Sequence, residues 1–361
     1  MVKSAYIHIP FCKSRCHYCS FFSTINTELK QEYINSLLNE INFYYENEPL
    51  QTLYFGGGTP SLLGIKDFQK ILKILNFSKN IELTIEINPD DAKYDYLKEL
   101  YNLGINRLSF GCQTFDDEIL KTINRRHSSE QIVKGYNNAR QAGFENISFD
   151  FIYGLPNQTI EGFEKDLQKA SEIGVEHISL YGLSIEKGCY FYKNRPDTPN
   201  DDKQADMYLM AVDLLKNYGY KHYEISNFAK SKHYSKHNMN YWQCGEYYGF
   251  GAAAHGYKSS IRYSNPSDLH KYIQTPTQHE HEKFLTKNEM LEEEIFLGFR
   301  KMDGINVPMI NEKFGINFEK KYRETLQKYQ DLNLIIKTEN GYKLSPNGVL
   351  VSNTILADFI E

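Results

Sequence analysis

The sequence has no long apolar run, no excess of basic residues and no secretory signal. No stretch approaches the roughly 20 apolar residues of a transmembrane helix, so none is predicted. The formal net charge of -5 argues against a surface dedicated to nucleic acid. With 41% hydrophobic and 24% charged residues among 361, the composition is that of a globular protein with a sizeable core.

Cysteine is scarce, and half of it lies in one stretch. Cys12, Cys16 and Cys19 stand in a C-x3-C-x2-C spacing directly after an apolar run, residues 5–9, that predicts a strand. Thiolates are soft ligands that select iron-sulfur clusters, zinc or cuprous copper. Three thiols can hold a four-iron cluster and leave one iron open to a non-protein ligand. The other cysteines are predicted to pack as small buried hydrophobic residues: Cys112, Cys189 and Cys244.

Two other interpretations of the cysteine motif remain open. A disulfide with one free thiol requires an oxidising compartment, and no secretory signal points to one. A structural zinc site needs a fourth ligand, for which His17 is the only local candidate. Its neighbours Cys16 and Tyr18 leave little freedom to close a tetrahedron. The spacing therefore favours the cluster.

Short apolar strands alternate with amphipathic helices through the first half of the chain. A helix is predicted over residues 28–45, and a later one opens with a capping box at Ser128 and Gln131 and ends at Gly143. The alternation predicts an α/β fold, a parallel sheet of near-continuously apolar strands curled into a partial (β/α)6 barrel. Six units fall short of the eight that close a barrel, and the carboxyl ends of the strands are the expected working face. The predicted strands are residues 5–9, 52–55, 82–87, 107–111, 146–152 and 177–183.

The second half of the chain is more polar and is predicted to divide into two parts. Residues 194–203 indicate a linker and 205–218 a helix, whereas 222–257 are predicted to be irregular and 264–287 loop-like. A helix over 289–302, two further helices, a hairpin turn at Asn340-Gly341 and a helix after Pro346 are typical of a winged-helix-like domain. Because this part is not basic, it is interpreted as packing or partner-facing. The predicted domains are residues 1–200, a barrel; 201–285, a linking helix and an aromatic segment; and 286–361, the C-terminal domain.

A glycine-rich turn follows the second predicted strand. Gly56-Gly57-Gly58-Thr59-Pro60 alone would indicate only a tight turn. Together with the three cysteines upstream, it resembles the radical S-adenosylmethionine (SAM) superfamily. The resemblance implies that the methionine part of SAM chelates the open iron and that the reduced cluster cleaves the sulfonium carbon-sulfur bond. Glycines let the backbone approach the amino group of the ligand.

Further segments resemble the oxygen-independent coproporphyrinogen III oxidase family over nearly the whole chain: YIHIPFC, EINP at 86–89, RLSFGCQTF, SFDFIYGLP and HNMNYW. Glu86 and Asp150 could instead be ion-paired structural carboxylates, and Arg125 could be solvated. A carboxylate inside an apolar strand is costly to bury unless paired, so a binding site is favoured. The resemblance implies a SAM site formed by Tyr6, Gly56, Gly57, Gly58, Thr59, Glu86, Gln113, Arg125 and Asp150.

Two departures separate the chain from the oxidases of that family. The oxidases carry a further cysteine two positions after the last cluster ligand, where this chain has Phe21. They also carry an extension before the first strand, whereas the first strand is predicted within a few residues of Met1. An H-N-x-x-Y-W segment resembles instead the heme-chaperone branch of the family, in which it is tied to heme binding. The matching residues are His237, Asn238, Tyr241 and Trp242.

The resemblance thus implies a radical SAM heme chaperone that binds a 4Fe-4S cluster, SAM and heme. Heme-requiring proteins, membrane-bound ones among them, are the expected recipients; the expected location is the cytoplasm or the membrane periphery. A homodimer is a candidate assembly, and no catalytic residue is assigned. Alternatives are an oxidase that decarboxylates coproporphyrinogen and a zinc-stabilised binding module. From the residues alone, His237 could simply cap a turn and Trp242 anchor a core. The heme ligand stays open among His237, His233, Cys244 and His255.

Overall fold

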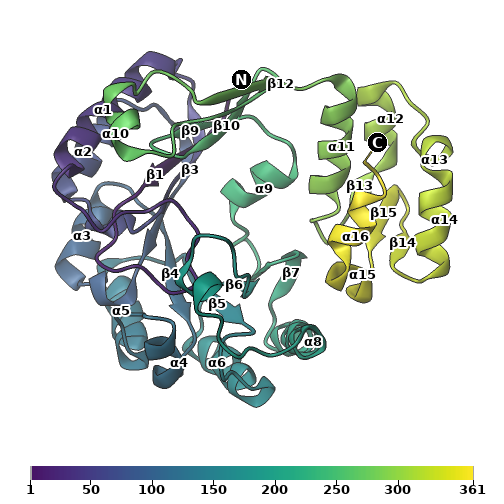
Figure 1. The fold of residues 1–361 in the computed structure, drawn as a ribbon, viewed down its shortest axis with the longest axis horizontal. Helices are drawn as coiled ribbons and strands as arrows, with labels where there is room; N and C mark the ends of the chain where they lie inside the picture. Colours follow the sequence, from purple (N-terminus) through teal and green to yellow (C-terminus); the bar gives the residue numbers. More distant parts are fainter. Residues whose placement is uncertain (1, 361) are drawn as a thin grey trace.

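The computed structural model describes residues 2–360, and a sheet of 12 strands organises it. Six of these strands, β1 to β6, are parallel neighbours in chain order, and the chain between them is largely helical. Figure 1 shows this sheet curving, with the intervening helices on its outer side. The predicted partial (β/α)6 barrel is confirmed. Its elements are β1 (Ser4–Ile9), α1 (Lys30–Tyr44), β2 (Leu50–Gly57), α2 (Ile65–Lys73), β3 (Phe77–Ile87), α3 (Tyr94–Asn102), β4 (Arg107–Gln113), α4 (Asp117–Thr122), α5 (Ser129–Ala142), β5 (Ile147–Tyr153), α6 (Ile160–Ile173) and β6 (His177–Gly182).

The six parallel strands alternate between apolar and polar side chains, so the prediction of near-continuously apolar strands is wrong. On β3, Leu83, Ile85 and Ile87 belong to the main hydrophobic core, whereas Thr84 and Glu86 point to the opposite face. The other strands behave alike, with buried polar residues at every second position. The outer face packs against the helices, and the inner face of the barrel is polar.

The chain after β6 adds strands to both edges of the sheet. β9 pairs in parallel with β1, β10 to β12 continue that edge, and β8 and β7 extend the edge at β6. The predictions of an irregular segment at 222–257 and a loop at 264–287 are therefore wrong. These strands are only three or four residues long, too short to show a periodic pattern in the sequence. The elements are α7 (Tyr190–Lys193), α8 (Asp201–Asn217), β7 (Lys221–Glu224), β8 (Asn227–Ala229), α9 (Lys236–Trp242), β9 (Tyr247–Phe250), β10 (His255–Lys258), β11 (Ile261–Ser264), α10 (Leu269–Gln274) and β12 (His281–Phe284).

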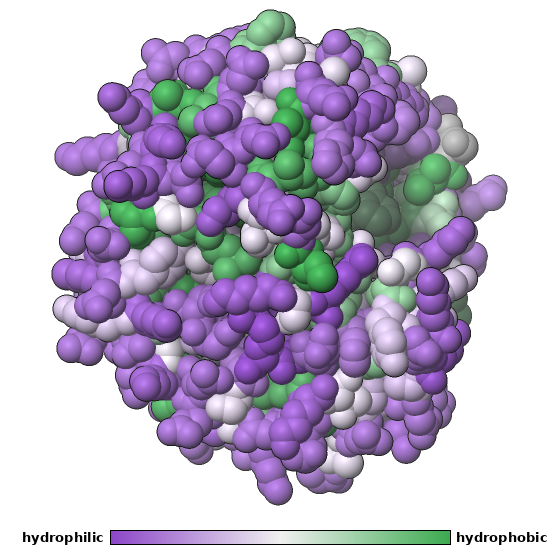
Figure 2. Space-filling model, turned by 60° about the vertical axis from the view of Figure 1, so that its left-hand side comes forward, coloured by the Kyte–Doolittle hydropathy of each residue, from purple (hydrophilic) through white to green (hydrophobic). Residues whose placement is uncertain are grey.

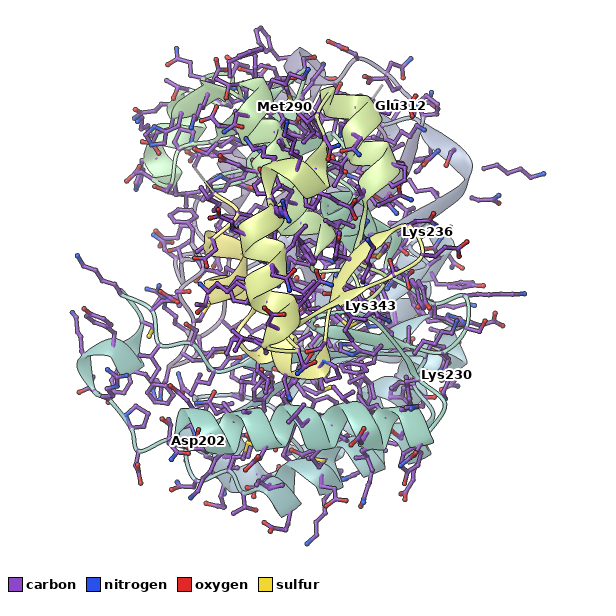
Figure 3. All side chains as sticks on the ribbon, turned by 90° about the vertical axis from the view of Figure 1, so that its right-hand side faces the viewer. Asp202, Lys230, Lys236, Met290, Glu312 and Lys343 are labelled. Carbon is purple, nitrogen blue, oxygen red and sulfur yellow. The ribbon has the colours of Figure 1, made fainter. Side chains whose placement is uncertain are left out.

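The C-terminal unit is helical with a small three-stranded sheet and has its own hydrophobic core. The predicted hairpin forms between β14 and β15, and β13 adds a third strand. Tyr208 of α8 joins this core, and Figure 3 shows α8, with Asp202 near its start, lying across the base of the unit. The elements are α11 (Lys287–Gly298), β13 (Ile305–Asn306), α12 (Val307–Phe314), α13 (Phe318–Lys321), α14 (Arg323–Asp331), β14 (Ile335–Lys337), β15 (Gly341–Leu344), α15 (Pro346–Leu350) and α16 (Ser352–Ala357).

The outer surface of the barrel is mostly hydrophilic. Figure 2 shows hydrophobic residues there in small separate areas, and a hollow toward the upper right of that view. Within residues 2–360, no helix has the length and apolar character needed to cross a membrane.

Candidate functional site

The loop after β1 carries the three cysteines and is closed by backbone hydrogen bonds. Cys12 N donates to Thr24 O at 2.9 Å, and Thr24 N donates to Pro10 O at 2.7 Å. Cys12, Cys16 and Cys19 all line one hollow of about 130 Å³. The structure therefore brings together the three predicted cluster ligands. Of the remaining cysteines, Cys112 and Cys189 are buried as predicted, whereas Cys244 is half-buried.

His17 anchors this loop to the rest of the barrel. Its Nδ1 atom is 2.9 Å from Thr122 O, its backbone N donates to Ile123 O, and its ring stacks on Tyr190 with centroids 4.1 Å apart. In the part of the chain that the structure describes, no group of three or more His, Cys, Asp or Glu side chains could hold a single metal ion. A cubane cluster places a different iron at each thiol, so its ligands do not converge on one point.

Two neighbouring side chains donate to the thiols. Arg125 Nη1 lies 3.2 Å from Cys16 Sγ, and the Thr59 hydroxyl lies 3.5 Å from Cys12 Sγ. Burial raises the pKa of Cys19 to about 11 and also raises the pKa of Cys12. Binding of iron must therefore displace protons from these thiols. The soft donor set and the cationic neighbour fit an anionic iron-sulfur cluster.

Gly58 is where the glycine-rich turn touches the cysteine loop. A Cβ atom there would come within 2.9 Å of Phe11 O and 3.0 Å of Cys12 Sγ. Since Phe11 O is backbone, the cysteine loop would have to move to admit even a methyl group. Gly57 has a different reason to be glycine, because its φ is +111° and a Cβ would lie 2.7 Å from the His8 ring.

The change Gly58→Ala is expected to weaken retention of the cluster by displacing Cys12. Gly64→Ala is the matched control, since a Cβ at Gly64 meets nothing closer than Asp67 Oδ2 at 3.6 Å. Iron and sulfide per chain, measured after anaerobic gel filtration, should fall for Gly58→Ala and match the wild type for Gly64→Ala. Equal iron content in both variants would contradict this account of the turn.

A larger cavity of about 400 Å³ adjoins the cysteine hollow. Gly56, Gly57 and Tyr6 lie beside it rather than in its wall. Gly57 N donates to Glu86 Oε2 at 3.2 Å, and a Cβ at Gly56 would clash with the Tyr6 ring at 2.9 Å. The predicted SAM-site residues thus form one region. Those lining the cavity are Gly58, Thr59, Glu86, Gln113, Arg125 and Asp150.

Two buried carboxylates dominate the electrostatics of the cavity. Burial, and then the negative charge of Asp150, raises the pKa of Glu86 to about 7. Burial also raises the pKa of Asp150, although hydrogen bonds from Ser179 and Ser109 oppose the shift. Ser109 Oγ donates to Asp150 Oδ2 at 2.8 Å. A cationic ligand would favour the ionised form of both groups.

Two polar atoms at the cavity are buried and have no hydrogen-bond partner within residues 2–360: Gln113 Oε1 and Arg125 Nε. The other atoms of the Arg125 guanidinium are engaged, since Nη2 donates to Gly111 O at 2.7 Å and to Asn88 Oδ1. Gln113 has a φ of +62°, which is strained for a residue with a side chain. A buried donor and acceptor of this kind can bind a polar ligand, so the residues present fit SAM.

The four residues predicted to bind heme lie on α9 and line neither cavity. His237 is 1% exposed; its Nδ1 is 2.8 Å from Thr52 Oγ1 and its Nε2 is 2.7 Å from the Tyr241 hydroxyl. Burial lowers the pKa of His237 to about 3, so the ring is neutral and both nitrogens are engaged. Asn238 N donates to the Ser235 side chain, and the Arg300 guanidinium lies 4.7 Å from the Trp242 ring.

Sequence reasoning missed three residues of the SAM-site region. Tyr54, Asn88 and Ser109 line the cavity. The Tyr54 hydroxyl donates to Glu86 Oε1 at 3.0 Å, and Asn88 Nδ2 lies 3.3 Å from Thr59 Oγ1. Tyr54 and Ser109 stand two residues before Gly56 and Gly111 on their strands and so share a face with them, whereas Asn88 directly follows the end of β3.

A parallel partial barrel whose first strand leads into a three-cysteine loop, beside a cavity with two buried carboxylates, defines a radical SAM protein. The profile of the Radical SAM superfamily matches residues 6–170, and that of the HemN C-terminal domain matches residues 285–351. Several curated relatives are named heme chaperone HemW. That of Lactococcus lactis is 39% identical over 362 residues, 95% of each chain, and that of Bacillus subtilis is 37% identical over 378 residues, 99% of each chain.

The chain therefore belongs to the HemW family of radical SAM proteins. Among solved structures, the coproporphyrinogen III oxidase HemN from Escherichia coli has the same fold, with a TM-score of 0.86 and 23% sequence identity, covering 99% of this chain and 89% of that one. Membership of the radical SAM superfamily implies a 4Fe-4S cluster and SAM as cofactors.

Proposed function

We propose that this protein is a heme chaperone that binds a 4Fe-4S cluster, SAM and heme and delivers heme to heme-requiring proteins. The near full-length similarity to curated proteins named heme chaperone HemW carries this proposal. We assign the SAM site to the barrel, residues 1–200, and heme binding to residues 201–285. Residues 286–361 then form a separate C-terminal domain, available to contact a recipient protein.

Cys12, Cys16 and Cys19 are the proposed cluster ligands, and the adjoining cavity is the proposed SAM site. When bound, the cluster can pass one electron to the sulfonium of SAM. Glu86 and Asp150 would face the positive charges and hydroxyl groups of that ligand. The unpartnered atoms Gln113 Oε1 and Arg125 Nε supply a further acceptor and donor. Thr59, Tyr6 and the glycine turn hold this arrangement in place.

The α9 segment is the proposed heme-binding region, but His237 is not its iron ligand in this proposal. Both of its ring nitrogens already bond to protein groups, one as donor and one as acceptor, so the single lone pair that the neutral ring could offer to iron is engaged. His237 would instead hold α9 in position for contacts through Asn238, Tyr241 and Trp242. The axial ligand then comes from His233, Cys244 or His255, of which His255 is exposed.

Phe21 argues against the alternative function, oxidative decarboxylation of coproporphyrinogen. It lines the 400 Å³ cavity and is 69% exposed, at the position where the oxidases of the family carry a cysteine. A phenyl group can neither donate nor accept a proton. Loss of one element that positions a substrate can remove several powers of ten from a rate.

We further propose that the protein works in the cytoplasm, reaches the membrane only as a peripheral partner of membrane-bound recipients, and contacts no nucleic acid. A homodimer is the candidate assembly, and sedimentation of the cluster-loaded protein tests it. The negative net charge supports the exclusion of nucleic acid.

One anaerobic preparation with its cluster reconstituted should bind heme and leave coproporphyrinogen unchanged. Heme binding is measured by absorption titration, and decarboxylation by product analysis with SAM and a reductant present. The His237→Ala variant should weaken heme binding by roughly tenfold, because the bond to Thr52 that ties α9 to β2 and the bond to Tyr241 within α9 are both lost. Its heme spectrum should stay that of the wild type, since the axial ligand is unchanged.

The matched control is His270→Ala, because His270 is exposed on α10, away from α9. This variant should bind heme as the wild type does, and circular dichroism should confirm that both variants fold. Robust conversion of coproporphyrinogen, or no heme binding by the wild type, would overturn the proposed function. An altered spectrum in His237→Ala would instead restore His237 as the ligand.

A further inference from the structure

The first turn of α9 is tied to the inner face of the barrel. Lys236 N and His237 N each donate to the carboxylate of Glu82 at 3.0 Å. Glu82 is 5% exposed and lies on β3, the strand that also carries Glu86. A carboxylate at the first N–H groups of a helix is a favourable arrangement. The start of α9, marked by Lys236 in Figure 3, is thus hydrogen-bonded to a strand that also contributes to the SAM site.

One buried chain of contacts connects α9 to Glu86. The His237 ring stacks on the Tyr54 ring with centroids 5.1 Å apart and planes 27° apart. The Tyr54 hydroxyl donates to Glu86 Oε1 at 3.0 Å. Because both His237 nitrogens are held by Thr52 and Tyr241, the ring cannot turn without breaking these bonds. A shift of Glu86 therefore acts on His237 through the Tyr54 ring.

A second buried chain connects α9 to Asp150 by hydrogen bonds alone. Ser235 N donates to the Tyr223 hydroxyl at 3.1 Å, and this hydroxyl lies 2.8 Å from His177 Nε2. His177 Nδ1 is 2.8 Å from Ser148 Oγ, which donates to Asp150 Oδ1 at 3.0 Å. Ser235 N–H can only donate, which fixes the direction of the chain. Each following group can then accept a hydrogen bond from the one before it and donate one to the next, ending at Asp150. His177 and Ser148 are fully buried, and bonds in such a chain strengthen one another.

We propose that Tyr54, His177 and Tyr223 are positioning residues that couple the SAM cavity to α9, so that SAM binding changes the affinity of the α9 segment for heme. A ligand cation at Glu86 competes with the Tyr54 hydroxyl for Oε1, and a ligand group at Asp150 competes with Ser148. Either event alters the support of the first turn of α9. The heme half of this inference rests on the proposed function. Thermodynamic linkage requires heme to change SAM affinity by the same factor.

Trp242 gives a readout of α9 that does not depend on heme. It is the only tryptophan of the chain and the last residue of α9, so its fluorescence reports a rearrangement of the helix. The experiment titrates SAM into cluster-loaded protein under anaerobic conditions and follows Trp242 emission. Equilibrium dialysis on the same sample gives the SAM affinity. Wild type is compared with Tyr223→Phe, which removes only the hydroxyl at the middle of the second chain.

Two further variants make the comparison specific. Tyr54→Phe interrupts the first chain but keeps the ring that stacks on His237. Tyr220→Phe is the matched control, because its buried hydroxyl donates to Val175 O at 2.6 Å and belongs to neither chain. Circular dichroism and thermal melting confirm folding. If Tyr223→Phe does not fold, Tyr54→Phe alone carries the test.

In the wild type, we expect SAM to change Trp242 emission with a midpoint equal to the dialysis Kd. In Tyr223→Phe and Tyr54→Phe, the change at saturation should fall by at least half. The SAM Kd of Tyr54→Phe should also fall, by roughly two- to tenfold, because no hydroxyl then competes with the ligand for Glu86 Oε1. Tyr220→Phe should match the wild type. The heme Kd of the wild type should shift by at least about fivefold on adding SAM, and by less in the two variants.

The coupling would be overturned if Trp242 emission in the wild type did not change when SAM binds. It would also be overturned if the change in emission were as large in both Tyr223→Phe and Tyr54→Phe as in the wild type. Either result is independent of whether heme binds. A wild type that binds SAM but no heme overturns the proposed function instead, and the Trp242 titration still decides the coupling between the cavity and α9.

Discussion

Replacing Cys16 by alanine is expected to remove the cluster from the protein altogether. The wild type, purified anaerobically, should contain about four irons per chain and show thiolate-to-iron absorption that bleaches on reduction. Cys16 supplies one of only three thiols in the hollow, and its sulfur also accepts a hydrogen bond from Arg125. Two thiols cannot retain the cluster through purification, so iron content should fall to near zero.

The matched control is Cys189→Ala, because Cys189 is a buried cysteine in a different part of the chain. It is 2% exposed and packs in a small apolar cluster with Phe191 and Leu155. This variant should keep its iron, although it loses some stability through the small void. The measurement is iron, sulfide and zinc per chain, with the visible spectrum. Stoichiometric zinc without iron in the wild type would refute the assignment of the three cysteines.

Replacing Arg107 by methionine is expected to lower the free energy of unfolding by about 3–5 kcal/mol, the range for leaving a buried charge without its compensating charge. Arg107 is 2% exposed at the start of β4. Burial alone would lower its pKa, but the charges of nearby groups, Glu82 first and Asp150 among them, raise it overall. Without the guanidinium, Glu82 and Asp150 would remain buried and lose this compensating charge.

Urea unfolding followed by far-ultraviolet circular dichroism measures this loss. Lys328→Met is the control, since Lys328 forms an exposed ion pair with Asp358 and its removal should cost at most about 1 kcal/mol. The double variant Glu82→Gln, Arg107→Met should lose less unfolding free energy than the sum of the two single changes. In the double variant, Glu82→Gln removes the carboxylate that Arg107→Met alone would leave without a compensating charge. Equal midpoints for Arg107→Met and Lys328→Met would contradict the assigned role.

Local signals in the sequence predicted much of the barrel. The capping box at Ser128 and Gln131 forms, and α5 ends at Gly143 in the left-handed conformation. The first predicted strand, residues 5–9, differs from β1 by one residue. These features depend on hydrogen bonds and side-chain spacing within a few residues, which a sequence shows directly.

The site could be predicted only in part, because its remaining members are defined by contacts across strands. Glu86 and Asp150 stood out as acidic residues within predicted strands. Tyr54, Ser109 and Arg107 did not, since a tyrosine, a serine or an arginine in a strand is unremarkable until its surroundings are known. Their common inward direction follows from the register of β2, β3 and β4.

The sequence by itself determined the three-cysteine loop, the glycine turn and the order of the strand-helix units. Only the tertiary structure decided where α9 lies and what His237 can do. Figure 1 shows α9 on the inner side of the curved sheet, facing the C-terminal unit. Its position depends on Glu82 and Thr52, which lie far from it in the chain, and on Tyr223, which precedes it. The physical reason is that these contacts arise from tertiary packing. The sequence has no local pattern for the hydrogen bond from His237 to Thr52, or for the two buried chains of contacts to Glu86 and Asp150.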